Sequence, residues 1–193
     1  MIKKLALTLA LASISASAAA SVVVYSENFE SYSVPTGSGE VFTRYAGTLG
    51  TWTVLGNSVD VIKGGYGAIN NQSLDLDGTP GPGGITRDIT TVIGNVYQLN
   101  FNYSGNGGAR PFNVAFGDLN NTFSGTNLVG AFSSGFFTAT STSTTLSFQG
   151  TSGKNSGATI DDITVTNVPE PGVLGLLIGG LAVGGLITRR NKK

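Results

Sequence analysis

Apolar and polar side chains alternate in short runs along the middle of this chain, and this two-residue period constrains the fold most strongly. Between Val96 and Tyr103, the side chains of Tyr97, Leu99 and Phe101 fall on one face and amide side chains on the other. Such alternation is typical of a half-buried β-strand. No part of the same region shows the 3.6-residue apolar period of an amphipathic helix. The middle of the chain is therefore predicted to be all-β.

Eight further runs have the length and composition of short strands, and Gly-, Pro- and Asn-rich turns separate them. They are Thr51–Leu55, Ser58–Ile62, Ser73–Asp77, Ile85–Ile89, Asn113–Phe116, Gly130–Thr138, Thr144–Phe148 and Ile160–Thr166. About nine short strands with such punctuation predict one antiparallel jelly-roll β-sandwich over residues 21–167. A domain of this length can bury a sufficient core without disulfides.

Composition excludes several classes of chemistry. The chain has no Cys and no His, so disulfides, thiol nucleophiles, Ser-His-Asp triads and Cys/His zinc sites are excluded. Its 11 basic and 11 acidic residues balance, but residues 21–168 hold five basic and ten acidic residues, a net charge of −5. A net-acidic domain argues against a nucleic-acid partner, because phosphate binding requires clustered Lys and Arg.

Residues 1–20 have the three parts of a secretory signal peptide. Lys3 and Lys4 precede an apolar run from Leu5 to Ile14, and small residues follow up to Ala20. Cleavage is predicted after Ala20, with Ala18 as the alternative site. An uncleaved anchor is the weaker interpretation, because the apolar run is shorter than the ~20 residues that a membrane span needs. The protein is thus expected to be exported by the Sec pathway.

Residues 172–188 form an uncharged, Gly-rich apolar run that is followed by a basic tail. As a helix it would be about 25 Å long, near the lower limit for crossing a bilayer. Arg189, Arg190, Lys192 and Lys193 would stay in the cytoplasm by the positive-inside rule. This places residues 21–168 outside, in agreement with the signal peptide.

Val168, Pro169, Glu170 and Pro171 precede this apolar run. A Pro-Glu-Pro motif, a short apolar helix and a terminal basic cluster in this order resemble the PEP-CTERM sorting signal, here residues 168–193. The resemblance implies a membrane-embedded exosortase as partner, cleavage near the motif, and delivery to the cell surface or extracellular matrix of a Gram-negative bacterium. The two prolines also hold the segment extended and accessible. The alternative is an unprocessed single-span protein with a periplasmic domain.

Short motifs in the middle of the chain resemble the choice-of-anchor C family. They include Asn28-Phe29-Glu30, Gly50-Thr51-Trp52, Ser73–Gly78, Val96–Phe101 and Ile160–Val165, in that order. The resemblance implies a galactose-binding-like jelly roll, similar to several carbohydrate-binding modules.

Three carboxylates are candidate ligands of a structural Ca²⁺ ion. Asp161 alternates with Ile163 and Val165, so it is expected to point inward, where an unpaired charge is costly. Modules similar to this family hold calcium between an N-terminal Phe-Glu and a C-terminal Asp-Asp motif, which here implies Glu30 with Asp161 or Asp162. Glu27 is a further candidate, and oxygen ligands suit Ca²⁺. The equally favoured alternative is that these carboxylates accept hydrogen bonds from backbone amides or Arg.

Other polar and aromatic residues are further candidates for a functional site. Asp75 and Asp77 alternate with Leu74 and Leu76 and are expected to form a solvated strand face, in preference to a second metal site or a catalytic pair. Tyr66 is the first choice for contact with a sugar. Trp52 is a second candidate, although a core position is preferred for it. Arg87 and Arg110 are expected to form salt bridges with surface Asp.

These observations predict a non-catalytic exported protein whose β-sandwich binds exopolysaccharide. The alternative is a structural adhesin or matrix protein without a specific ligand. An enzyme acting on polysaccharide is the weakest hypothesis, because the sequence contains no recognisable catalytic group.

Overall fold

The computed structural model describes residues 20–35 and 41–169. The chain divides into two compact units, of which Ser21–Val168 is one. The predicted signal peptide, the apolar run 172–188 and its basic tail lie outside the described residues, apart from Ala20. Across the described ranges there is no α-helix, and hence none long and apolar enough to cross a membrane.

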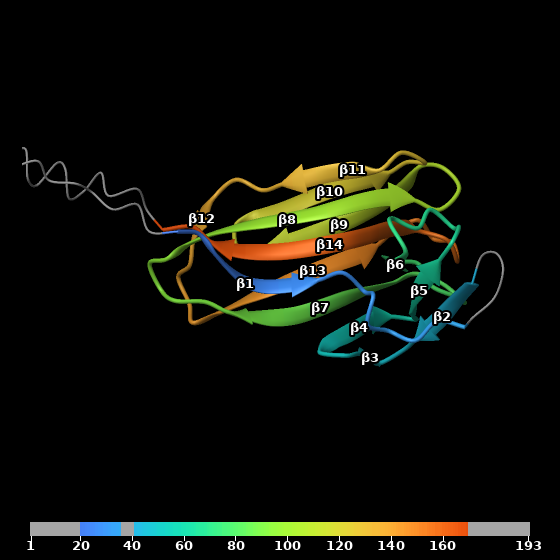
Figure 1. Cartoon of the computed structure of the whole chain (residues 1–193), viewed down its shortest axis with the longest axis horizontal. Helices are drawn as coiled ribbons and strands as arrows, with labels where there is room; N and C mark the ends of the chain where they lie inside the picture. The colour runs from blue at the N-terminus through green and yellow to red at the C-terminus, as the bar shows by residue number, and fades with distance from the viewer. Residues whose placement is uncertain (1–19, 36–40, 170–193) are drawn as a thin grey trace, which may run out of the picture. The chain divides into compact units, whose positions relative to one another are not determined.

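Two antiparallel sheets make up the Ser21–Val168 unit (Figure 1). The larger sheet has the order β11-β8-β14-β6-β5-β2, with β1 also paired to β14 and β12 to β8. Its strands are β1 (Val22–Glu27), β2 (Val41–Tyr45), β5 (Val59–Lys63), β6 (Gln72–Asp75), β8 (Val96–Gly105), β11 (Gly130–Ser133), β12 (Phe137–Thr138) and β14 (Ala158–Asn167).

The smaller sheet has the order β10-β9-β13-β7-β4-β3. Its strands are β3 (Thr48–Leu49), β4 (Trp52–Gly56), β7 (Gly83–Thr90), β9 (Arg110–Phe116), β10 (Leu119–Gly125) and β13 (Ser143–Gly150). The prediction of an all-β, antiparallel domain is confirmed. Each of the nine predicted runs overlaps a strand, and the predicted Gly130–Thr138 strand is divided into β11 and β12.

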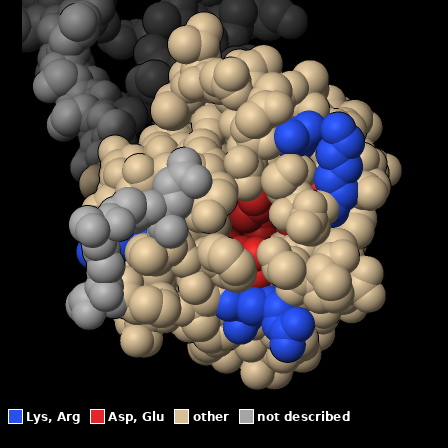
Figure 2. Space-filling model, turned by 90° about the vertical axis from the view of Figure 1, so that its right-hand side faces the viewer, with Lys and Arg blue, Asp and Glu red and all other residues tan. Residues whose placement is uncertain are grey.

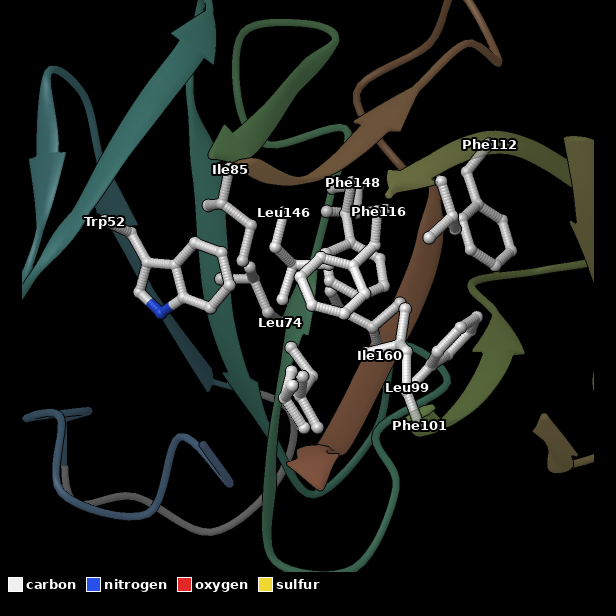
Figure 3. Close-up of a cluster of buried hydrophobic side chains, with 14 of the residues drawn as sticks. Trp52, Leu74, Ile85, Leu99, Phe101, Phe112, Phe116, Leu146, Phe148 and Ile160 are labelled. Carbon is white, nitrogen blue, oxygen red and sulfur yellow. The ribbon is translucent and has the colours of Figure 1, made fainter. Parts of the chain in front are cut away.

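Apolar side chains from both sheets meet in one core (Figure 3). Phe101 on β8 contacts three rings of the facing sheet, with centroid distances of 5.2 Å to Phe148, 5.5 Å to Phe123 and 6.3 Å to Phe112. Tyr97 and Leu99 are buried as the alternation predicts. Because the two inner faces interdigitate around these rings, the domain is a β-sandwich.

The central strand β14 changes partners along its length. Its first residues pair with β6, and from Ile163 onward it pairs with β1. At the change, the pairing with β8 shifts register between Asp161 and Thr164, and Asp162 has a φ of 50°. This irregularity, a β-bulge, leaves Asp162 and Ile163 out of the regular pairing with β8, whereas Asp161 still pairs with Asn102.

The chain enters and leaves the sandwich at one end. Val22 pairs with Asn167, and the amide of Val168 donates to the carbonyl of Val96 at 2.8 Å. Strands β2, β5 and β6 lie at the other end, on the right of Figure 1. The two ends of the sandwich are therefore available for different tasks.

Candidate functional site

A pocket of about 320 Å³ opens at the end of the sandwich that carries β2, β5 and β6. Figure 2 views this end and shows acidic atoms at the bottom of a hollow, with basic groups on two sides of it. The pocket combines carboxylates, amides and aromatic rings. Its lining residues are Phe42, Asp60, Ile62, Tyr66, Asp75, Thr79, Asn106, Asn155 and Ser156.

Asp60 and Asp75 form the acidic floor. They are direct partners across the β5–β6 ladder, so they lie side by side on one wall of the pocket. Asp60 is 5% exposed and accepts a hydrogen bond from the amide of Thr79 at Oδ2. Within the described residues its Oδ1 is buried and has no hydrogen-bond partner. The floor thus contains an uncompensated carboxylate oxygen.

Three uncharged donors hold Asp75. Its Oδ1 accepts from the amides of Asp77 at 3.0 Å and Gly157 at 2.8 Å, and its Oδ2 accepts from Asn106 Nδ2 at 2.9 Å. Burial nevertheless dominates, and it raises the pKa of Asp75 to about 7. Burial also raises the pKa of Asp60. Asp75 therefore keeps its proton to a higher pH than an ordinary carboxyl group does.

The expectation that Asp75 and Asp77 form a solvated face is wrong. Asp75 is 2% exposed and Asp77 is fully buried. The physical reason is that β6 is an inner strand between β14 and β5, and the loops after β8 and β13 cover its second face. Ser152 donates to Asp77 Oδ2 from both its amide and its hydroxyl. Alternation in the sequence indicates that a strand has two faces, but it does not show that one of them is exposed to solvent.

Aromatic rings form the wall beside this floor. Tyr66 and Phe42 meet edge to face, with centroids 6.1 Å apart. Tyr66 has a φ of 55°, a left-handed conformation that is uncommon for a bulky residue. The structure thus places the sequence's first choice for sugar contact in the pocket, next to the carboxylates.

Arg110 supports the polar wall. Its guanidinium donates to the carbonyls of Asn106 and Gly107 and to the Ser156 hydroxyl. These bonds join the two loops that carry the pocket's amide side chains. Arg87, by contrast, lies 3.9 Å from the ring centroid of Tyr25 and donates to the Thr51 hydroxyl.

Trp52 lies in the core. It is 1% exposed, its ring meets Tyr25 and Phe148 edge on, and its indole N–H donates to Glu27 Oε2 at 3.4 Å. Protein atoms therefore cover the ring, which leaves no face on which a sugar could stack. The preferred core position of Trp52 agrees with this burial.

Glu30 and the Asp pair approach the same segment, residues 70–72. Glu30 accepts from the amide of Gln72 at Oε1 and from Asn71 at Oε2. Asn70 Nδ2 lies 3.3 Å from Asp161 Oδ2 and 3.1 Å from Asp162 Oδ2. Asp161 is buried as predicted, and burial is the main cause that raises its pKa to about 7.

The geometry of this acidic group favours hydrogen bonding. Amides of the backbone donate to Glu30 and to Asp161, as the alternative interpretation expects. No three carboxylates among the described residues lie close enough together to hold a metal ion. Glu27 is engaged separately, since it accepts from the amide of Phe29 and the hydroxyl of Tyr32.

Several pocket residues are missing from the sequence-based candidates. Asp60 belongs to a predicted strand, but only the β5–β6 pairing shows that it faces Asp75. Asn106 and Asn155 lie in Gly- and Ser-rich loops that read as turns. A polar residue inside an otherwise apolar strand, as Asp60 is, was the one available signal.

No family model matches this chain, and no curated protein matches it. Solved structures with a similar fold include the C-terminal family 22 carbohydrate-binding module of Clostridium thermocellum Xyn10B, with 17% identity and a TM-score of 0.45, covering 77% of this chain and 94% of that one. A Podospora anserina GH26-CBM35 β-(1,4)-mannanase has 18% identity and a TM-score of 0.44 over 70% of this chain. The chain spans 29% of that enzyme's length, and likewise 29% of an exo-β-1,3-galactanase from Phanerochaete chrysosporium. Similarities this remote do not indicate a function for this chain. An inference about function must therefore come from the residues of the pocket.

Proposed function

We propose that this chain is a non-catalytic polysaccharide-binding protein whose binding site is the Tyr66 pocket. The observation that carries the proposal is the joining of an aromatic wall with buried carboxylates and amides in a hollow of about 320 Å³. Ligand pockets characteristically combine apolar walls with a few fixed polar groups. A sugar ring offers an apolar face to Tyr66 and hydroxyls to Asp60, Asn106 and Asn155.

The position of the pocket in the sandwich supports the same proposal. The pocket is at the end of the sandwich away from Val22 and Asn167, where the chain enters and leaves. A domain tethered through Val168 would therefore present the pocket away from its attachment. Such an arrangement suits a jelly-roll domain displayed at the cell surface or in an extracellular matrix.

Catalysis is the alternative that the two carboxylates raise. Glycosidases place an acid and an ionised base or nucleophile on opposite sides of the scissile bond. Asp60 and Asp75 instead lie side by side, and the pKa of each is raised. Neither flanks the hollow from the opposite wall, so the pair supports binding rather than hydrolysis. Release of reducing sugar from the bound polysaccharide would revive the enzymatic hypothesis.

Sorting is the second part of the proposal. Residues 1–20 direct export, and an exosortase processes the chain at Val168–Pro171 while residues 172–188 lie transiently in the inner membrane. Val168 is still hydrogen bonded to β8, so the motif begins directly where the sandwich ends. The active site of a membrane protease would meet a short, extended segment there. The alternative function, a matrix protein without a specific ligand, would be sorted in the same way but would not bind polysaccharide.

Retention on the native exopolysaccharide tests binding. The full chain should be retarded in affinity electrophoresis, and Tyr66→Ala should abolish the retardation. Phe136→Ala is the matched control, because Phe136 is an exposed aromatic residue that is absent from the pocket lining. Equal migration of the wild-type protein with and without polysaccharide would contradict the proposal and favour the structural adhesin.

A further inference from the structure

We propose that the pocket selects a cationic residue of the polysaccharide, an amino sugar whose amine is free and protonated. The inference rests on the proposed function and narrows it to a class of ligand. Its basis is the joining of a buried carboxylate pair, one oxygen of which has no hydrogen-bond partner among the described residues, with an aromatic wall in one hollow of saccharide size.

In the described ranges of the chain, the carboxylates of the pocket floor have no cationic hydrogen-bond donor. The donors to Asp60 and Asp75 are backbone amides, the Thr79 hydroxyl and the Asn106 side chain, all of them uncharged. Within the described residues, Asp60 Oδ1 is buried without any partner. Leaving such a buried group unsatisfied destabilises the protein, and the cost is greater when the group is charged. An ammonium group brings both a charge and three N–H donors to this floor.

Basic groups flank the pocket, but they have little effect on its floor. Arg44 pairs with Asp60 across the β2–β5 ladder, and Arg110 acts on Asp77 behind the floor. Each Arg has the smallest of the effects that act on the pKa of its carboxyl. Burial is the largest effect on Asp60, Asp75 and Asp77, and it raises all three pKa values. An ammonium group entering the pocket would lower them, so binding should release protons at neutral pH.

A metal ion fits the pocket less well than an ammonium group does. Ca²⁺ takes six to eight oxygen ligands, whereas N–H donors already point at three of the four floor oxygens. The volume of about 320 Å³ exceeds what one ion needs. Tyr66 and Phe42 add aromatic surface, which attracts a cation or the apolar face of a sugar but contributes nothing to ligation.

The same floor discriminates against other sugars. A uronic acid would bring a second negative charge to Asp60 and Asp75, and like charges at this range repel. An N-acetylated sugar keeps the ring face for Tyr66 but has lost the charge and two donors. The affinity of the pocket should therefore be highest for sugars whose amine is free.

Calorimetric titration of the full chain with three soluble oligosaccharides tests the inference. The probes are a glucosamine tetramer, its N-acetylated counterpart and a galacturonic acid tetramer. At pH 7 we expect the glucosamine tetramer to bind at least tenfold more tightly than the N-acetylated one. No heat is expected with the uronate, and the glucosamine signal should depend on the buffer's ionisation enthalpy, which reports proton release.

Asp60→Asn is the diagnostic variant, because it keeps the size and the acceptor for Thr79 but removes the charge. It should lose the preference for the free amine, whereas Asp88→Asn, on an exposed strand position, should keep it. Equal melting temperatures of the variants and the wild type exclude misfolding. If Asp60→Asn fails to fold, Tyr66→Ala serves in its place and should lower affinity for the glucosamine tetramer at least tenfold.

The outcomes separate this inference from the proposed function. Equal or tighter binding of the N-acetylated or acidic probe would overturn the inference, and polysaccharide binding through Tyr66 would still stand. Binding that disappears on adding EGTA while the melting temperature stays unchanged would also overturn it, since a metal would then occupy the floor and not the site of Glu30, Asp161 and Asp162. Lack of binding to every probe and to the native exopolysaccharide would contradict both.

Discussion

Asp75 shows how one buried carboxyl group makes the domain sensitive to pH. Its pKa of about 7 in the folded protein is above its ordinary value of 3.8. Between these values the folded state binds the proton and the unfolded state does not. Stability should therefore fall as pH rises from about 4 to about 7. The ceiling for one such group is about 4 kcal/mol, from ~1.4 kcal/mol per pKa unit.

Urea unfolding of the full chain at pH 5 and pH 8 checks this prediction. The wild type should be more stable at pH 5, and Asp75→Asn should reduce the difference because the amide is neutral at both pH values. Asp161, with a pKa also near 7, should account for much of the remainder. A wild type that is more stable at pH 8 than at pH 5 would contradict the raised pKa of Asp75.

Calcium at Glu30, Asp161 and Asp162 remains a proposal at the residue scale. Carboxylate oxygens of Asp161 and Asp162 meet at Asn70, Glu30 binds the next two residues of the chain, and an ion bound by the Asp pair would lower the raised pKa of Asp161. It would require Glu30 to turn away from Asn71 and toward the Asp pair. Three of the four non-glycine residues with positive φ among the described residues flank this group: Phe29, Asn70 and Asp162.

Scanning fluorimetry with and without EGTA tests calcium. If the ion ties β1 to β14, removing it should lower the melting temperature by several degrees, and Asp161→Asn should lose this response. An unchanged melting temperature in EGTA would end the calcium proposal and leave the observed hydrogen bonds as the role of these carboxylates.

At the scale of elements, close packing between neighbouring backbones limits the loops around the pocket. A Cβ atom on Gly125 would collide with the backbone carbonyl of Ser104, at the end of β8 beside the Asn106 loop. Gly135 has open space around its missing side chain and no positive φ. Gly125→Ala should therefore destabilise the protein by about 1–3 kcal/mol, while Gly135→Ala should change stability by less than about 0.5 kcal/mol. Equal urea midpoints for the two variants would contradict this packing.

The strands also show what a two-residue pattern in the sequence can and cannot predict. Strands with a large apolar face, such as β8 and β13, are evident from sequence. Strand β10, Leu119–Gly125, is mostly polar, and its seven residues pair along β9. Strand β1 begins with three consecutive valines that are exposed, so it shows no alternation. Edge strands owe their conformation to a neighbour, and a single sequence does not display that neighbour.

The acidic floor could not be predicted for the same reason. Asp60 and Asp75 are 15 positions apart in sequence and become a pair only through the β5–β6 register. Tyr66 was identifiable because a Gly-rich loop exposes an aromatic residue. The loops that bury Asp75 and Asp77 come from distant parts of the chain, so strand periodicity could not show that both faces of β6 are covered.

At the scale of the whole molecule, the near-zero net charge combines three different segments. The basic residues of the two ends belong to the predicted export and sorting signals, and the domain between them is acidic. If both signals are removed, the mature protein carries a net charge of about −5 at neutral pH, less any protons held by its buried carboxyls. An acidic domain that binds a cationic polymer would also be attracted to it over a distance, and salt would weaken this attraction.

Processing is checked by intact-mass analysis of the protein isolated from its own cells. The mass should match a chain that begins at Ser21 and ends near Pro169–Pro171. Pro169→Ala with Pro171→Ala should accumulate the uncut form, because the segment can then continue into a helix. A native protein that retains Arg189 to Lys193 would instead be a single-span membrane protein.

Mapping the bound sugar on the protein shows whether the Tyr66 pocket is the binding site. In amide NMR spectra of the full chain, titration with an oligosaccharide of the native polysaccharide should shift the signals of Tyr66, Asn106 and Asn155 together, with one saturation curve. Signals near Phe136, which is outside the pocket lining, should stay unchanged. Saturable shifts confined to the outer face of either sheet, with the pocket signals unmoved, would contradict the account.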